Sequence, residues 1–254
     1  MLLIANSCLA ELLFSSDLFG MALFTLKNDL ERKESEHIIC IVQGYVSYVG
    51  YSLQNYCFLL QAFYRFMIVI HPTHLYYQTA KFQLILIGTV WIFSFSYAIP
   101  ILYTGQLKYN VANQICQMPL GFSFYGVYTA LCIYGIPISL IMGAYTKVVQ
   151  YVRKLNKQVS STNLVYRAER ELKMIRRIVI IVLIIVVIGF PYAVFSFMAF
   201  FVDPPEYYLR IAFACVDMSL PMMMITLLLF TEPLKAAILK RLHVKMNLIT
   251  AVAI

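Results

Sequence analysis

Six long apolar segments constrain this chain more than any other feature of its sequence. They lie at about 1–26, 37–70, 82–104, 121–152, 174–202 and 208–230. Each reaches the ~20 residues that an α-helix needs to cross the hydrocarbon core of a bilayer. In lipid only helices and closed barrels satisfy their backbone groups, and barrel strands are short and alternating. The sequence therefore predicts an all-α integral membrane bundle with six transmembrane helices.

The charge distribution predicts which loops lie inside the cell. The chain is 61% apolar, 13% charged and has a net charge of +8. The segment 147–177 contains nine basic and two acidic residues, whereas 27–36 and 203–210 are mixed. Cytoplasmic loops carry an excess of lysine and arginine, so the basic loops and both chain ends are expected inside. Membrane topology explains the charge without nucleic acid, and the lipid bilayer is the expected partner.

The end of the chain resembles a helix that lies on the membrane surface. We expect the transmembrane bundle to occupy residues 1–231, followed by an amphipathic cytoplasmic helix and tail at 232–254. An apolar face and a basic face are typical of binding to the anionic inner leaflet. The apolar positions are Leu234, Ile238 and Leu242, and the basic ones are Lys235, Lys240 and Arg241.

Among the ionisable residues within or at the end of apolar segments, Arg65, Glu11 and Asp217 require an explanation. Charges at membrane depth are costly, usually face the bundle interior and often mark function. Arg65 is one, although its side chain would also be accommodated if it reached the cytoplasmic interface. Glu11 and Asp217 are the others, and with Gln54 we expect them to form a buried polar core near mid-membrane. The alternative is ordinary hydrogen bonding between helices.

Two of the six cysteines fall on the outer side of this topology. Cys40 opens the second segment, and Cys116 lies in the next outside loop. Because the outside is oxidising, a disulfide between them is chemically reasonable. The alternative is a pair of unpaired thiols. The other four lie within helices and are interpreted as small apolar packing residues.

Taken in order, these positions resemble the landmarks of rhodopsin-like (class A) G-protein-coupled receptors. Cys40 and Arg65, twenty-five positions apart, are similar to the two ends of that family's third helix. The first helix has no counterpart, because Met1 already falls within the second. The resemblance implies a divergent member with six helices of a seven-helix fold. The further matches are Leu9-Ala10-Glu11-Leu12-Leu13, Pro72, Trp91, Pro100, Cys116, Pro137, Tyr145, Glu171, Pro191 and Pro221.

Several family motifs are altered in this chain. The family's Asp-Arg-Tyr is replaced by Tyr64-Arg65-Phe66, and its Cys-Trp-x-Pro by Ile188-Gly189-Phe190-Pro191. Its Asn-Pro pair in the last helix is replaced by Leu220-Pro221. A conventional sodium site and a tryptophan toggle are therefore not expected.

The resemblance implies a two-state mechanism. A ligand from outside favours a state in which the sixth helix swings outward and opens a cleft for a heterotrimeric G protein. Arg65 and Glu171 would hold that cleft closed, since Tyr64 replaces the usual acid, and Tyr145 joins them as a switch residue. The alternative is two charges solvated at the interface. Pro137, Gly189, Pro191 and Pro221 are expected to kink their helices, or else are tolerated there as in any membrane helix.

For ligand contact we expect the outer half of the second segment. Gln43, Ser47 and Tyr51 recur every four residues and share one face without a fixed charge. Amine receptors of the family carry an aspartate where Ser47 stands, and opsins need a retinal-binding lysine where Ala214 stands. The resemblance thus argues against amine and light, and a peptide is favoured. The alternative is that the three residues only pack.

Other classes of protein account for the sequence less well. Six helices are common in channels, but Val49-Gly50-Tyr51, which echoes a potassium filter, falls inside a long helix. A transporter would show two matching halves. An enzyme has little support, because His71 and His74 lack partners for a metal, and we assign no catalytic residue, metal or cofactor. A non-signalling receptor fragment remains an alternative. We expect a multi-pass membrane protein, at the plasma membrane if full length.

Overall fold

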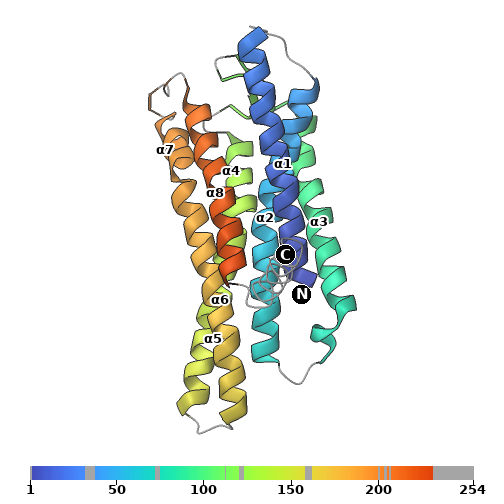
Figure 1. The fold of residues 1–254 in the computed structure, drawn as a ribbon, viewed down its shortest axis with the longest axis vertical. Coiled ribbons are helices and arrows are strands. Elements are labelled where there is room, and N and C mark those ends of the chain that lie inside the picture. Colours follow the sequence, from blue (N-terminus) through green and yellow to red (C-terminus); the bar gives the residue numbers. More distant parts are fainter. Residues whose placement is uncertain are drawn as a thin grey trace, which may run out of the picture.

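The computed structural model describes residues 2–31, 38–71, 75–111, 113–119, 123–157, 162–199, 201–202, 205 and 207–230. In this part of the chain the six apolar segments form six roughly parallel helical rods (Figure 1). This confirms the all-α helical bundle predicted from the sequence. The surface helix predicted for 232–254 and the Pro72–His74 stretch lie outside the described residues.

The first three rods and the last described rod are each a single helix. Two more are composite, since one contains a π-helical segment, η2, and the other is interrupted at Gly189. A short 3₁₀ turn and a two-stranded hairpin complete the described elements. The rods are α1 (Leu2–Glu31), α2 (Ile38–Ile70), α3 (Ala80–Tyr103), α4 (Phe124–Ala130) with η2 (Leu131–Gly135) and α5 (Ile136–Lys157), α6 (Thr162–Ile188) with α7 (Phe190–Met198), and α8 (Tyr208–Phe230); the connecting elements are η1 (Leu75–Gln78), β1 (Lys108–Asn110) and β2 (Ile115–Gln117).

Four of the helical spans in the described residues are long and apolar enough to cross a membrane. They are Leu2–Glu31, Ile38–Ile70, Ala80–Tyr103 and Phe124–Leu155. Their outward faces are rich in exposed Leu, Ile and Phe, which suits contact with lipid. The chain is a multi-pass membrane protein.

Helix α2 is the centre of the bundle, because it packs against α1, α3, α5 and α6. We call the end that carries Cys40 the outer end and the end that carries Arg65 the inner end, following the charge asymmetry. At the inner end α5 and α6 extend as a pair beyond the other rods (Figure 1). A cluster containing Val148, Val152 and Ile175 fills their interface.

The start of α6 differs from the sequence prediction. The apolar segment begins at 174, whereas the helix begins at Thr162. The extra turns carry many charges, but a helix satisfies its own backbone hydrogen bonds without lipid. The buried side chain of Ala168 and the partly buried side chain of Leu172 hold these turns against α5. Hydropathy marks where lipid begins, so it misses the part of the helix that continues beyond it.

Both composite rods are interrupted where the sequence places glycine or proline. The π-helical segment η2 ends immediately before Ile136-Pro137, and proline cannot donate the backbone hydrogen bond that a regular helix needs there. Gly189 separates α6 from α7, and Pro191 falls in the first turn of α7. Pro221 lies inside α8, which continues through it.

The Val49-Gly50-Tyr51 tripeptide lies within α2 and packs against α1. A Cβ on Gly50 would overlap Cδ2 of Phe14, so the glycine allows the Phe14 ring to reach the helix backbone. This segment is a helix–helix contact and has none of the geometry of a re-entrant filter loop.

Candidate functional site

At the inner end, an ion pair joins α2 to α6. Nη1 of Arg65 lies 2.8 Å from Oε2 of Glu171. The Glu171 side chain is only 3% exposed, while that of Arg65 is 24% exposed. The sequence had placed these residues opposite each other through the family resemblance, and the structure brings them together.

Glu171 has a second cationic neighbour that the sequence analysis missed. Nη2 of Arg170 lies 3.4 Å from the other carboxylate oxygen, Oε1. Arg170 is largely exposed, so most of its charge is screened by solvent. Cζ of Arg65 also lies 5.9 Å from the centre of the Tyr64 ring. Tyr64, which replaces the family's acid, therefore contacts the arginine through its ring face.

Tyr145 packs against two apolar clusters that join the same helices as this ion pair. It packs against a cluster that includes Phe58 and Ala62, and against another that includes Val148 and Ile175. These clusters join α2, α5 and α6. The predicted switch residues Arg65, Glu171, Tyr64 and Tyr145 thus all belong to one three-helix interface.

Near the middle of the bundle, the predicted polar core is only partly assembled. Nε2 of Gln54 donates to Oε2 of Glu11 over 3.0 Å, and both side chains are buried. Asp217, on α8, is half-buried and forms a hydrogen bond with neither of them. The structure therefore brings together Glu11 and Gln54 but not Asp217.

A polar chain on the inner side of Glu11 was not predicted. Nε1 of Trp91 donates to Oδ1 of Asn6, and Nδ2 of Asn6 donates to Sγ of Cys57. Nε2 of Gln61 donates to Oγ of Ser7. Asn6, Ser7 and Gln61 are uncharged, so the signal that marked Glu11 and Arg65 did not mark them. These contacts join α1, α2 and α3.

The three predicted ligand residues share one face of α2, as expected, and that face lies against α1. Tyr51 packs edge-on against Phe14 with ring centres 4.6 Å apart. Oγ of Ser47 donates to Oδ2 of Asp17 over 2.5 Å. Nε2 of Gln43 lies 3.2 Å from the place that a Cβ on Gly20 would take. The expectation of a region without fixed charge is wrong, because α1 supplies the Asp17 carboxyl.

At the outer end, the hairpin β1–β2 is fixed to the bundle. The predicted Cys40–Cys116 disulfide is confirmed, with 5.4 Å between the Cα atoms. Gly44, one turn further along α2, allows a second close contact, since a Cβ there would lie 2.8 Å from the backbone oxygen of Cys116. Together they hold β2 against the end of α2.

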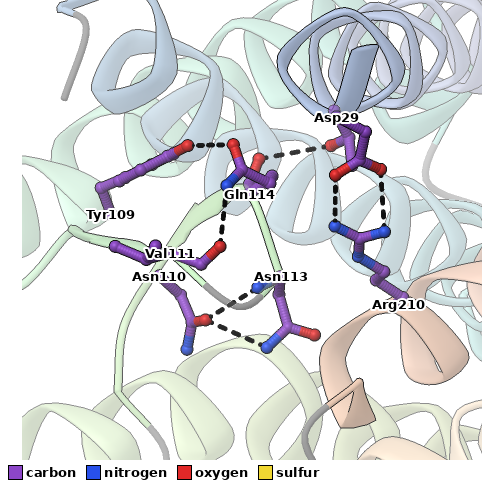
Figure 2. Close-up of polar contacts among 8 residues, drawn as sticks. Asp29, Tyr109, Asn110, Val111, Asn113, Gln114 and Arg210 are labelled. Carbon is purple, nitrogen blue, oxygen red and sulfur yellow. Dashed lines mark hydrogen bonds and ion pairs between the residues drawn. The ribbon is translucent and has the colours of Figure 1, made fainter. Parts of the chain in front are cut away.

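The turn of the hairpin is organised by Gln114, which adopts a positive φ of 57° (Figure 2). Its side chain accepts a hydrogen bond from the hydroxyl of Tyr109 and donates to the carbonyl of Val111. Oγ1 of Thr25 donates to the Gln114 carbonyl over 3.3 Å. The hairpin is thereby linked to α1 as well as to α2.

Beside this turn, a bidentate ion pair joins α1 to α8. Nη1 and Nη2 of Arg210 lie 2.8 Å from Oδ2 and Oδ1 of Asp29 (Figure 2). The two side chains are 31% and 38% exposed. Both charges belong to mixed segments of the sequence, but nothing in the sequence indicates that they meet, because 181 positions separate them.

The bundle, its membrane-length helices and the disulfide at its outer end define a multi-pass membrane protein of the receptor type. The chain belongs to the family described as 7 transmembrane receptor (rhodopsin family), which it matches over residues 1–232. The divergent motifs seen in the sequence therefore occur within that family.

Two curated relatives are opsins. The chain is 24% identical over 165 residues to the freshwater form of rhodopsin from Anguilla anguilla. This match covers 61% of this chain and 46% of that protein. It is 24% identical over 166 residues to a pineal opsin from Petromyzon marinus. That match covers 62% of this chain and 36% of that protein. The matched region spans less than half the length of these relatives.

Proposed function

We propose that this chain is a membrane receptor that binds an extracellular ligand and activates a heterotrimeric G protein at its inner end. Family membership supports a receptor, and the Arg65–Glu171 ion pair carries the proposal. That pair joins α2, the centre of the bundle, to α6, the helix that the mechanism requires to move.

The surroundings of the pair suit a contact that opens and closes. Glu171 is buried against its partner, whereas Arg65 remains partly exposed to solvent. Breaking the pair leaves Arg65 able to reach water, so the opened state is accessible. Partly exposed ion pairs contribute about 1 kcal/mol, and a difference of about 1.4 kcal/mol changes an equilibrium tenfold. A single contact of this size is sufficient to bias two states without locking the protein permanently.

The break between α6 and α7 supplies a point at which such a movement can occur. Gly189 and Pro191 remove regular helix geometry there, and the outer part of the rod is a separate short helix. We propose that α6 moves at its inner end about this break. The π-helical segment η2 before Pro137 is the corresponding irregularity in the neighbouring rod.

The proposed ligand is not a retinal attached through lysine. The opsin resemblance implies a lysine in the last helix, but Ala214 occupies that position and residues 208–230 contain no lysine. A Schiff base with a carbonyl ligand requires a lysine amine. We propose a soluble extracellular ligand, and a plasma-membrane location follows from that role.

Replacing Glu171 tests the proposal directly. The change Glu171→Gln keeps the size of the side chain and removes its charge, so the closed state loses the ion pair. We expect ligand-free activation of the G protein to rise several-fold, up to about tenfold, measured as heterotrimer dissociation in cells at equal surface expression. The matched control is Glu169→Gln, two residues away on the exposed face of the same helix. Unchanged or lower basal signalling in Glu171→Gln would contradict the proposal.

A further inference from the structure

Asp17 is an acidic residue inside α1 that the proposed switch does not use. It lies within a membrane-length helix and is half-buried. Its Oδ2 accepts a hydrogen bond from Ser47, whose side chain is 1% exposed. Ser47 is seven positions from Cys40 along α2, which places Asp17 about 10 Å inward from the disulfide at the outer end.

The partners of Asp17 do not neutralise a carboxylate. Ser47 offers one neutral hydroxyl, and the same hydroxyl lies 3.0 Å from Sδ of Met21. Among the described residues, no lysine, arginine or histidine forms an ion pair with Asp17. Arg210, the cation of α8 at this end of the bundle, is held by Asp29.

Asp17 differs from Glu11, which lies six positions earlier on the same helix. The Glu11 residue is 2% exposed and lies deep between α1 and α2. The Asp17 side chain is more accessible, and a carboxylate accepts several hydrogen bonds, of which Ser47 uses one. The face around it also carries Gln43, which can donate hydrogen bonds, and Tyr51, which offers an aromatic surface.

We propose that Asp17, oriented by Ser47, is the anionic anchor for a positively charged ligand group, an ammonium or a guanidinium, that enters from the outer end. This inference rests on the proposed receptor function and specifies the chemical class of its ligand. The cation would neutralise a charge whose burial in a membrane bundle is otherwise unfavourable. Gln43 and Tyr51 would contact the rest of the ligand through a hydrogen bond and a ring face.

A thiol placed beside Asp17 tests both access and charge preference. The full chain carries Gln43→Cys, with Cys8, Cys57, Cys132 and Cys215 replaced by alanine and the Cys40–Cys116 disulfide kept. Purified protein in nanodiscs is treated with 2-aminoethyl methanethiosulfonate, which is cationic, and with 2-hydroxyethyl methanethiosulfonate, which is neutral. The measurement is the ratio of the cationic to the neutral labelling rate. This ratio is compared between the protein that keeps Asp17 and the Asp17→Asn variant.

We expect Asp17→Asn to lower the cationic-to-neutral rate ratio about tenfold, because it removes the charge and keeps the side-chain shape. Asp17→Glu should restore most of the ratio. The control thiol is Tyr103→Cys on α3, which is 91% exposed and whose ratio should not respond to Asp17. In the protein that keeps Asp17, the anionic 2-sulfonatoethyl methanethiosulfonate should react more slowly at position 43 than the neutral reagent. That comparison needs no variant at position 17.

Two results would overturn the inference. One is a thiol at position 43 that neither reagent reaches, and the other is a rate ratio that is the same with Asp17 and Asp17→Asn. The labelling requires no G protein, so its outcome is independent of the Glu171→Gln test. Charge-dependent labelling with unchanged basal signalling would contradict only the proposed switch, and the reverse combination only the ligand class.

Discussion

The two ends of this bundle are held together in different ways. At the outer end, a disulfide, a hairpin hydrogen bonded to α1 and a bidentate ion pair join α1, α2, α8 and the β1–β2 hairpin. At the inner end, the ion pair that the described residues form between α2 and α6 is Arg65–Glu171, and the clusters around it are apolar. Apolar contacts are non-directional, so α6 can slide or tilt on them once the ion pair opens. The difference implies a fixed outer end and a movable inner end.

The largest expected effect comes from removing the disulfide. The double change Cys40→Ala and Cys116→Ala releases a constraint that links positions 76 residues apart. We expect the protein to lose about 2–5 kcal/mol of stability, measured by thermal unfolding in detergent. Cys8→Ala, at a free and half-buried cysteine, is the control and should cost much less. A loss no larger than that of the control would show that the outer end is fixed by something else.

A smaller effect is expected at Gly44, where the hairpin approaches α2. Gly44→Ala would place a methyl group 2.8 Å from the Cys116 backbone oxygen, which the disulfide holds in place. We expect a net loss of about 1–3 kcal/mol in unfolding free energy. In Gly88→Ala, by contrast, the new methyl group meets nothing within 4 Å, so helix propensity alone should stabilise the protein by up to about 1 kcal/mol. Equal effects at the two glycines would contradict the close packing of the hairpin.

The smallest effect is expected from the outer ion pair. Arg210→Gln removes a bidentate contact, but both side chains are about a third exposed, and solvent screening limits its contribution to about 1 kcal/mol. The loss should shrink as salt is raised from 0.01 to 0.5 M. Lys27→Gln, which affects a longer and more exposed pair with Glu31, should change stability less. Basal signalling should stay at its wild-type level in Arg210→Gln, and a rise would break the distinction between the two ends.

The sequence predicted the bundle well because each apolar segment reports its own burial in lipid. Cys40, Cys116, Arg65 and Glu171 were found because they are rare residue types at positions that resemble a family pattern. Asp17, like Glu11, is an acid in an apolar helix. The sequence does not indicate that its carboxyl contacts Ser47 on α2, because that contact depends on how the two helices pack. The Asp29–Arg210 pair could not be predicted for a similar reason, because only the packing of α1 against α8 brings these two charges together.

Whether the inner end moves while the outer end stays fixed can be tested by measuring distances at both ends of the same molecule. Pairs of spin labels replace exposed residues, at Lys81 and Lys173 near the inner end and at Leu30 and Ile211 near the outer end, in a chain without free cysteines. Electron-resonance distance distributions are then compared with and without Glu171→Gln. We predict a longer or broader inner distance in the variant and an unchanged outer distance. An unchanged inner distance, or an equal shift at both ends, would contradict the claim that Arg65–Glu171 closes a movable inner end.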